Sequence, residues 1–207
     1  RDAVDEHLFD GVPDRASVRA ALELPQEQNL LLSAGHLYPR KGAGTLAAAA
    51  ASVPGALFVF VGGTEEDRRA FADKWGTAAN IRIVGHVPHG KVPLYLRAAD
   101  LLVLPNSGKD EDASRFTSPM KLFEYMLSGT PIIASDVPAL PEILDETTAT
   151  LVPPDESAVL AEGIRASLGH LDEAHVRATA ARSRAANYTW RKRVEVLLSV
   201  LYARNQP

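Results

Sequence analysis

The chain contains a series of short apolar runs, each followed by a segment with a helical pattern. These runs cover residues 29–35, 56–61, 81–84, 101–104, 132–134 and 150–152. They lack the alternation of apolar and polar residues that is typical of a half-exposed strand. Buried strands that are each followed by a helix predict a parallel sheet covered on both faces. The sequence therefore favours a Rossmann-like three-layer α/β/α fold, in which ligands bind at the carboxyl ends of the strands.

Helical patterns fill most of the remaining chain. They cover residues 45–51, 64–75, 91–99, 119–128, 156–168, 172–186 and 190–202. Thr64 is a suitable N-cap, and the three acids that follow it suit the positive end of a helix dipole. The segment 106–114 is polar and acidic, and we expect a mobile loop there, beside the carboxyl edge of the sheet.

Composition limits the class of protein. The chain has 207 residues, of which 46% are hydrophobic and 23% charged, as in an ordinary soluble α/β domain. Its net charge of −4, with both signs interspersed, argues against nucleic acid as the main partner. The absence of cysteine excludes disulfides and thiolate metal sites. Because the chain begins at Arg1 rather than at a methionine, we expect a fragment of a larger protein.

The segment 117–138 carries the strongest local signal. Thr117 and Ser118 are N-cap residue types, and Pro119 is favoured at the first position of a helix. Gly129 then ends that helix before a buried strand. Free N–H groups at a helix start, beside two hydroxyls, suit a phosphate. We therefore predict half of a nucleotide site here.

The helix within this segment carries a candidate binding residue. Its apolar positions are Met120, Phe123, Met126 and Leu127, and its polar positions are Lys121, Glu124 and Ser128. Glu124 lies about one turn from the predicted phosphate site, and its carboxylate suits the diol of a ribose. The alternative is an ion pair with Lys121 on a solvent-facing side of the helix.

Two turns that follow strands are further candidates. In the loop 35–42 (GHLYPRKG), glycines at both ends allow close backbone approach, while Arg40 and Lys41 can neutralise a diphosphate. The alternative is a surface loop with solvated cations. The turn Gly85–Val87 can hold a base through its backbone, and His86 is expected to pack or to face solvent. Gly62 and Gly63 lack the G-x-G-x-x-G spacing, so we interpret them as a plain strand-to-helix turn.

Together these segments resemble the carboxyl-terminal domain of the GT-B glycosyltransferases, in particular the retaining family 4 (glycosyl transferases group 1). VDEHLFD is similar to the interdomain pattern N-G-V-D-x-x-x-F, and GHLYPRKG to the G-R-L-x-x-x-K-G loop. NIRIVGHVP and LYLRAADLLVLPN are similar to the base-binding turn and the unit after it. SPMKLFEYMLSGTPIIASDVPALPEIL is similar to a variant of the E-x7-E region, and YTWRKRVEVL to the terminal crossover helix. The resemblance covers nearly the whole chain.

The resemblance implies a role for each candidate residue. Lys41 and Arg40 would bind the donor diphosphate with main-chain groups of Thr117–Met120, which include Ser118 and Pro119. Glu124 would bind the ribose hydroxyls and act with these cations in catalysis. The turn Gly85–Val87, which contains His86, would hold the base, and Gly35 and His36 would also contact the donor.

Two positions depart from the family pattern. The first glutamate of E-x7-E falls on Phe116, so the contact that this acid makes to the donor sugar must be made otherwise or not at all. The usual arginine of the first loop is His36, and Arg40 beside Lys41 would replace its charge.

The resemblance also implies a domain organisation. Residues 1–25 would be an interdomain linker, 26–187 a nucleotide-sugar-binding Rossmann-like domain and 188–207 a crossover helix. That helix would face an amino-terminal acceptor domain that is missing from this chain, and its apolar residues are expected to be exposed here. They are Trp190, Val194, Leu197, Leu198 and Leu201.

The implied reaction transfers a sugar, with retention, from a UDP-, GDP- or ADP-sugar to an acceptor hydroxyl. The acceptor would be a sugar or a lipid-linked molecule in polysaccharide, lipopolysaccharide or glycoconjugate synthesis. No metal or cofactor is expected, because cations and the helix dipole supply the positive charge. The protein would be cytoplasmic, with peripheral association of the full-length protein on the inner membrane face, and the isolated domain would be inactive.

Three alternatives remain open at this point. The chain could be a non-catalytic nucleotide-sugar-binding module, which Phe116 favours. It could belong to a GT-B nucleotide-sugar epimerase, whose further catalytic groups would lie outside this chain. A dinucleotide-dependent oxidoreductase is the least favoured, because no glycine fingerprint opens the first helix.

Overall fold

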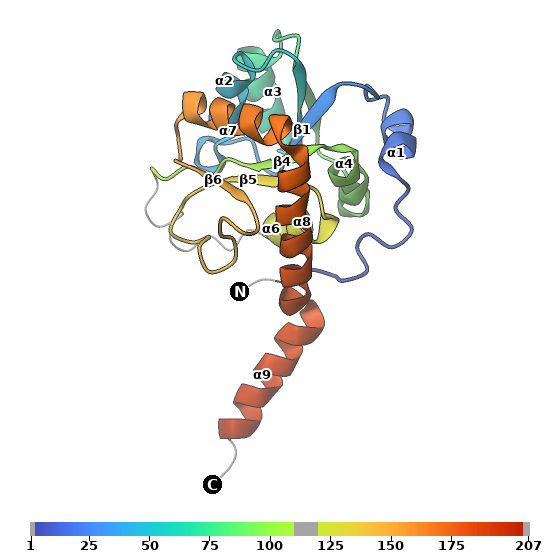
Figure 1. Cartoon of the computed structure of the whole chain (residues 1–207), viewed down its shortest axis with the longest axis vertical. Coiled ribbons are helices and arrows are strands. Elements are labelled where there is room, and N and C mark those ends of the chain that lie inside the picture. Colours follow the sequence, from blue (N-terminus) through green and yellow to red (C-terminus); the bar gives the residue numbers. More distant parts are fainter. Residues whose placement is uncertain (1–2, 110–119, 205–207) are drawn as a thin grey trace.

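A parallel sheet forms the centre of the domain, with its strands in the order β3-β2-β1-β4-β5-β6 (Figure 1). The computed structural model describes residues 3–109 and 120–204. The strands are β1 (Asn29–Ala34), β2 (Ala56–Val61), β3 (Ile81–Gly85), β4 (Leu101–Leu104), β5 (Ile132–Ser135) and β6 (Thr150–Val152). The order reverses between β1 and β4, which is where ligands of such sheets bind.

The strands are buried on both faces, as their lack of alternation predicted. In β1, Leu30 and Leu32 pack into the core on one side of the sheet, while Leu31 packs into the core on the other. In β2, Val59 and Phe60 divide between the two cores in the same way. The predicted three-layer arrangement is therefore confirmed.

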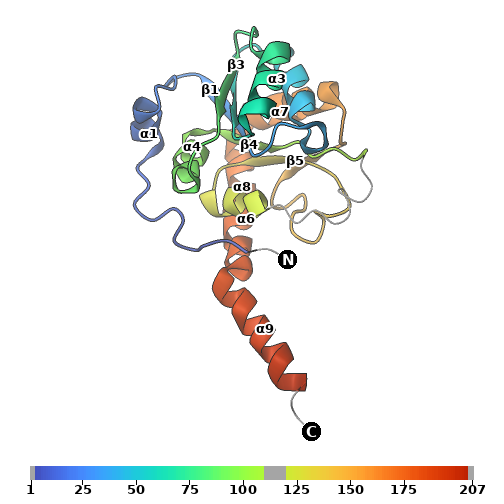
Figure 2. The ribbon, with the colours of Figure 1, turned by 180° about the vertical axis from the view of Figure 1, so that it is seen from behind.

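The helices lie in two layers. One face of the sheet is covered by α2 (Ala43–Ala50), α3 (Glu65–Trp75) and α7 (Ser157–Gly169). The other face is covered by α4 (Val92–Ala98), α6 (Met120–Ser128) and α8 (Leu171–Ala185), with α1 (Arg15–Ala21) at the side (Figure 2). Short 3₁₀ helices are η1 (Pro39–Lys41), η2 (His89–Lys91) and η3 (Ala186–Tyr188), and α9 (Trp190–Arg204) ends the described chain.

Most predicted elements form within one or two residues of the expected bounds. The Thr64 side chain caps α3 through the N–H of Asp67, while the Asp67 side chain accepts from the N–H of Thr64. The strand predicted over 29–35 ends at Ala34, because Gly35 leaves extended geometry with a φ of 127°. Helix α1 was not predicted; it has only seven residues and begins after the N-cap Asp14.

The loop expected to be mobile at 106–114 begins as buried structure, and this part of the prediction is wrong. Asn106 and Ser107 are buried, and the N–H of Ser107 donates to the carbonyl of Arg40 over 3.2 Å. Gly108 N–H donates to the carboxylate of Asp155 over 2.8 Å. Positions 110–114 lie outside the described residues.

Helix α9 extends away from the sheet, as Figures 1 and 2 both show. Its large apolar residues are between 45% and 62% exposed, which confirms the predicted apolar surface. They are Trp190, Val194, Val196, Leu197, Leu198, Val200 and Leu201. At its base, an isolated bridge joins Val4 to Thr189, and the N–H of Val4 donates to Tyr188.

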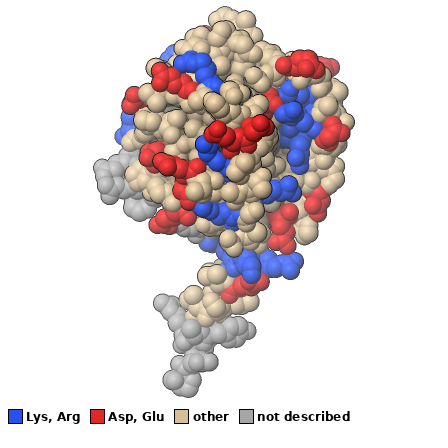
Figure 3. Space-filling view, in the orientation of Figure 1, with Lys and Arg blue, Asp and Glu red and all other residues tan. Residues whose placement is uncertain are grey.

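The first residues of the chain also pack on the domain. Helix α1 contacts α4, and Val18 is part of the core. Residues 3–25 of the segment predicted as an interdomain linker (1–25) thus pack on the domain; the role as a linker stays a prediction. On the face in Figure 3, basic and acidic side chains are interspersed, in keeping with the net charge.

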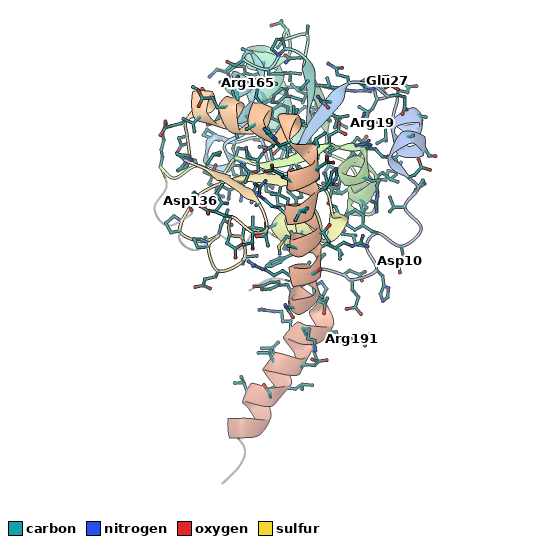
Figure 4. The ribbon with its side chains drawn as sticks, in the orientation of Figure 1. Asp10, Arg19, Glu27, Asp136, Arg165 and Arg191 are labelled. Carbon is teal, nitrogen blue, oxygen red and sulfur yellow. The ribbon has the colours of Figure 1, made fainter. Side chains whose placement is uncertain are left out.

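A buried ion pair between Arg19, labelled in Figure 4, and Asp100 fastens α1 to the amino edge of the sheet. Arg19 is 3% exposed, and its Nη2 lies 2.6 Å from a carboxylate oxygen of Asp100. Its remaining donors reach the carbonyls of Pro25, Gln26, Gln28 and Ala98. Asp100 in turn accepts from the N–H of Leu30 and pairs with Arg15. Every charge in this group has partners, which is the condition for burying it.

We predict that Arg19→Met lowers the free energy of unfolding by about 3–5 kcal/mol, because the buried Asp100 carboxylate loses its main partner. Urea denaturation measures this change. Arg69→Met is the matched control: it breaks an exposed pair with Glu65 and should cost less than about 1 kcal/mol. Equal effects of the two substitutions would contradict the prediction.

Candidate functional site

At the carboxyl edge of the sheet, glycines at the ends of three neighbouring strands leave a surface of bare backbone, which we call the glycine floor. Gly35, Gly62 and Gly85 end or follow β1, β2 and β3, and each has a positive φ. The N–H of Gly35 donates to Val61, and that of Gly62 to Gly85. A Cβ on Gly62 would lie 2.6 Å from the carbonyl oxygen of Gly35, so a side chain does not fit there. This edge is open to close approach by a ligand.

A pocket of about 580 Å³ lies over this floor. Its volume is in the range of small-molecule sites. Four predicted site residues line it: Gly35, His36, His86 and Val87. The remaining lining residues are Ala34, Val61, Gly62, Gly63, Thr64, Glu65, His89 and Val92. Gly62 and Gly63, interpreted from sequence as a plain turn, thus belong to the pocket wall.

The loop after β1 is fastened to the loop after β4. Gly42 has a φ of 70°, and a Cβ there would lie 1.5 Å from the carbonyl oxygen of Pro105. The bond between Ser107 and Arg40 joins the same two loops. This contact lies where the strand order reverses, and it holds the half-buried Lys41 at that position.

Helix α6 is anchored to the end of β1. The hydroxyl of Tyr125 accepts from the N–H of Ala34 over 2.7 Å, and the ring is fully buried. Burial raises the pKa of Tyr125, so the hydroxyl stays neutral. The helix therefore holds a fixed position relative to the glycine floor.

The predicted faces of α6 are partly wrong. Met120, assigned to the apolar face, is 48% exposed, while the polar Glu124 and Ser128 are 8% and 2% exposed. Met120 is the first residue of the helix, and the buried residues of α6 begin at Leu122. Ser128 satisfies its hydroxyl locally, since it donates to the carbonyl of Tyr125 and accepts from the N–H of Thr130.

Glu124 is buried and does not face solvent. Its Oε1 lies 2.7 Å from Nε2 of His89, a residue of η2 that lines the pocket. The alternative of a solvent-facing pair with Lys121 is therefore wrong. His89 was not predicted, because its contact to Glu124 joins residues 35 positions apart and leaves no local pattern.

Lys121, which the sequence predicted on the polar face of the helix, lies beside Gly35. Its Nζ lies 3.4 Å from the position that a Cβ on Gly35 would occupy. Burial, and then the charge of Lys41, lower its pKa to about 7, while Glu124 opposes the shift. Lys121, Lys41 and Glu124 thus form one charged cluster at the end of β1.

Arg40 lies on a different side of the loop. Its guanidinium carbon is 5.0 Å from the ring centroid of Tyr38, which stacks on His36. Arg40 and Tyr38 line a second pocket, of about 630 Å³, with Phe71 and Trp75 of α3. The structure therefore does not place Arg40 in the pocket over the glycine floor, and its diphosphate contact stays a prediction.

Several predicted residues cannot be placed. Thr117, Ser118 and Pro119 lie outside the described residues, and so does Phe116. In the chain from 3 to 109 and from 120 to 204, no cluster of His, Asp and Glu is suited to a metal ion. Over the same residues, no helix has the length and apolar character needed to cross a membrane.

We predict that Gly42→Ala destabilises the chain by about 3 kcal/mol or more, because a Cβ would collide with Pro105 and strain the backbone. Gly44→Ala, two residues on, is the matched control: a Cβ there meets nothing within 4 Å, and stability should be unchanged or raised by up to about 1 kcal/mol. Thermal unfolding compares them, and an unchanged Gly42→Ala variant would show that the loops separate freely.

Lys121 should make stability depend on pH. Its folded pKa of about 7 lies below the ordinary lysine value, so the unfolded chain binds more protons between these values. The charge of Lys121 therefore lowers stability fully below pH 7, and this cost disappears as the pH rises toward 10. Lys121→Met should be more stable than wild type at neutral pH, by a difference that shrinks toward pH 10 in urea denaturation. The exposed Lys192→Met should show no such trend.

Comparisons with known proteins agree with this geometry. The model of the glycosyl transferases group 1 family matches residues 28–170, more than half of the chain. D-inositol 3-phosphate glycosyltransferase of Mycobacterium tuberculosis is 28% identical over 198 residues, which cover 90% of this chain and 39% of that protein. The chain thus spans about two fifths of the length of this curated relative.

Solved structures show the same architecture. Sucrose-phosphate synthase from Thermosynechococcus elongatus matches with a TM-score of 0.82 at 28% identity, over 99% of this chain and 52% of that one. HepE of Anabaena, solved in complex with UDP-glucose, matches with a TM-score of 0.82 at 20% identity, over 97% and 56% of the two chains. The chain belongs to the glycosyl transferases group 1 family, and its three-layer domain is the C-terminal half of a GT-B fold.

Proposed function

We propose that this chain is the donor-binding part of a retaining glycosyltransferase. The full protein would transfer a sugar from a nucleotide-diphosphate sugar to an acceptor hydroxyl. The observation that carries the proposal is the glycine floor at the ends of β1, β2 and β3, with the buried Glu124 and the half-buried Lys41 near the end of β1. A nucleotide needs three things from such a site: space to lie against the protein backbone, a hydrogen-bond acceptor for its ribose hydroxyls and a cation for its phosphates.

Each part of the nucleotide has a place in this arrangement. The base would lie against the turn Gly85–Val87, whose residues 86 and 87 line the pocket. The ribose hydroxyls would donate to Glu124, which His89 orients from the pocket wall. The diphosphate would lie toward Lys41 and the start of α6. Backbone contacts to the base leave UDP, GDP and ADP all open as donors, and the UDP-glucose complex of HepE supports UDP.

The chemistry requires stabilisation of a leaving group. As the glycosidic bond breaks, negative charge grows on the departing diphosphate, and a fixed ammonium at Lys41 would stabilise it. Loss of such a group costs about 10²–10³ in rate. Retention of configuration, and the absence of a metal requirement, rest on the resemblance to the retaining group.

The acceptor would be held elsewhere in the full-length protein. A GT-B enzyme has a second half, and the exposed apolar residues of α9 supply a surface on which it could dock. We expect the isolated chain to bind donor without transferring sugar. The acceptor would be a sugar or a lipid-linked molecule of a cell-surface polysaccharide or related glycoconjugate. The protein would work in the cytoplasm, with peripheral contact to the inner membrane face.

A second candidate is a non-catalytic nucleotide-sugar-binding module. Phe116 favours it, because this residue stands where the family pattern has an acid. Donor hydrolysis by the full-length protein separates the two: measurable hydrolysis supports the enzyme, and binding without hydrolysis supports the module.

We predict that calorimetric titration detects binding of at least one of UDP-glucose, GDP-mannose and ADP-glucose, and no binding of NAD. Lys41→Ala and Glu124→Gln should each raise Kd about tenfold or more, because each loses a charge-assisted contact. Lys74→Ala, in the second pocket, and Glu162→Ala, exposed on α7, are the matched controls. Preference for NAD, or unchanged binding by both site variants, would refute the proposal.

A further inference from the structure

Lys121 has no role in the site as proposed so far, although it lies within it. It is the second residue of α6, and Tyr125 fixes this helix to the end of β1. The side chain folds toward Gly35, where no side chain separates its nitrogen from the glycine floor. A ligand lying on that floor would therefore meet the Lys121 nitrogen.

The charges around Lys121 do not balance. Within the described residues, the charged groups that act on it are Lys41 from η1 and Glu124 from α6. Glu124 already lies 2.7 Å from His89 Nε2, so its carboxylate is shared. Tyr125, one turn further on, stays neutral. Two side-chain amines thus face one shared carboxylate, and an anion would relieve the excess of positive charge.

We propose that Lys121 is a donor-binding residue whose side-chain nitrogen, held beside Gly35, contacts the diphosphate of the nucleotide sugar together with Lys41. This inference rests on the proposed function and adds a residue to it. The diphosphate diester of a nucleotide sugar carries two negative charges, which two ammonium groups match. The diol of the ribose carries none and suits the carboxylate instead.

A proton should enter the site with the donor. In the free protein, burial and Lys41 hold the pKa of Lys121 at about 7, so the amine is mostly neutral at pH 8. A bound diphosphate favours the ammonium, and the amine then takes up a proton from solvent. The diester itself does not titrate between pH 6 and 8. Donor binding is thus linked to the uptake of one proton by Nζ of Lys121.

The test is calorimetric titration of the 207-residue chain with the tightest-binding of UDP-glucose, GDP-mannose and ADP-glucose. Repeating it in buffers of different ionisation enthalpy gives the number of protons taken up. We expect about 0.9 proton at pH 8 and about 0.1 at pH 6, and a Kd about tenfold higher at pH 8, because only about a tenth of Lys121 is charged there.

Variants identify the residue that takes up the proton. Lys121→Met should abolish the uptake at pH 8 and weaken binding about a hundredfold or more at pH 6, where the wild-type ammonium is present, because uptake of nearly a whole proton at pH 8 requires a coupling of that size. Lys192→Met, exposed on α9, should behave as wild type. Three histidines line the pocket and can also exchange protons, so uptake that persists in Lys121→Met would overturn the inference.

The outcomes separate the two proposals. Donor binding by wild type without proton uptake at pH 8 would refute the role of Lys121 and leave the donor site standing. Failure of all three nucleotide sugars to bind would refute the proposed function, and this inference with it. Absence of uptake in wild type refutes the role of Lys121 without any variant, and Lys121→Gln replaces Lys121→Met in assigning the proton if the latter does not fold.

Discussion

The site depends on one close contact, between Gly42 and the carbonyl of Pro105. The distance of 1.5 Å from a hypothetical Cβ to that oxygen means that only glycine permits the loops after β1 and β4 to meet. These strands lie on either side of the reversal in strand order, where a parallel sheet opens at its carboxyl edge. The contact also fixes the backbone next to Lys41, which directly precedes Gly42 in the chain.

A second constraint is the hydrogen bond from the N–H of Ala34 to the Tyr125 hydroxyl, which fixes α6 to the end of β1. It brings the first turn of α6 beside the end of β1, so that Lys121 lies next to Gly35 and within the electrostatic influence of Lys41 and Glu124. Opposite and like charges are thereby placed on rigid elements before any ligand arrives. Preorganisation of this kind is what makes electrostatic stabilisation effective in a site shielded from water.

The sequence was sufficient for the fold and for part of the site. Apolar runs such as 101–104 predicted buried strands because both faces of a parallel sheet exclude water, and Thr64 predicted the start of α3 by its capping chemistry. Gly35, His36, His86 and Val87 line one pocket because the carboxyl ends of parallel strands share an edge, while their contact to a donor stays a prediction. These signals are local, or follow from the topology alone.

Other residues were missed because their environment is made by distant parts of the chain. His89 meets Glu124 only after η2 and α6 pack together, and Lys121 meets Gly35 only after α6 docks on β1. Periodicity placed Met120 in the core, yet a helix end that projects past its neighbours is exposed whatever its pattern. Helix α1 is too short for a periodic signal, and its buried Arg19 is fixed by carbonyls from four separate positions.

The ion pair of Arg19 with Asp100 lies before β4, at the edge of the sheet opposite to the pocket. Anchoring and ligand contact are thus carried by separate ends of the same strands. Loops around the pocket can accordingly diverge in length and chemistry while the opposite end keeps the scaffold intact. A domain arranged in this way offers evolution a means to change donor preference without first having to rebuild the protein.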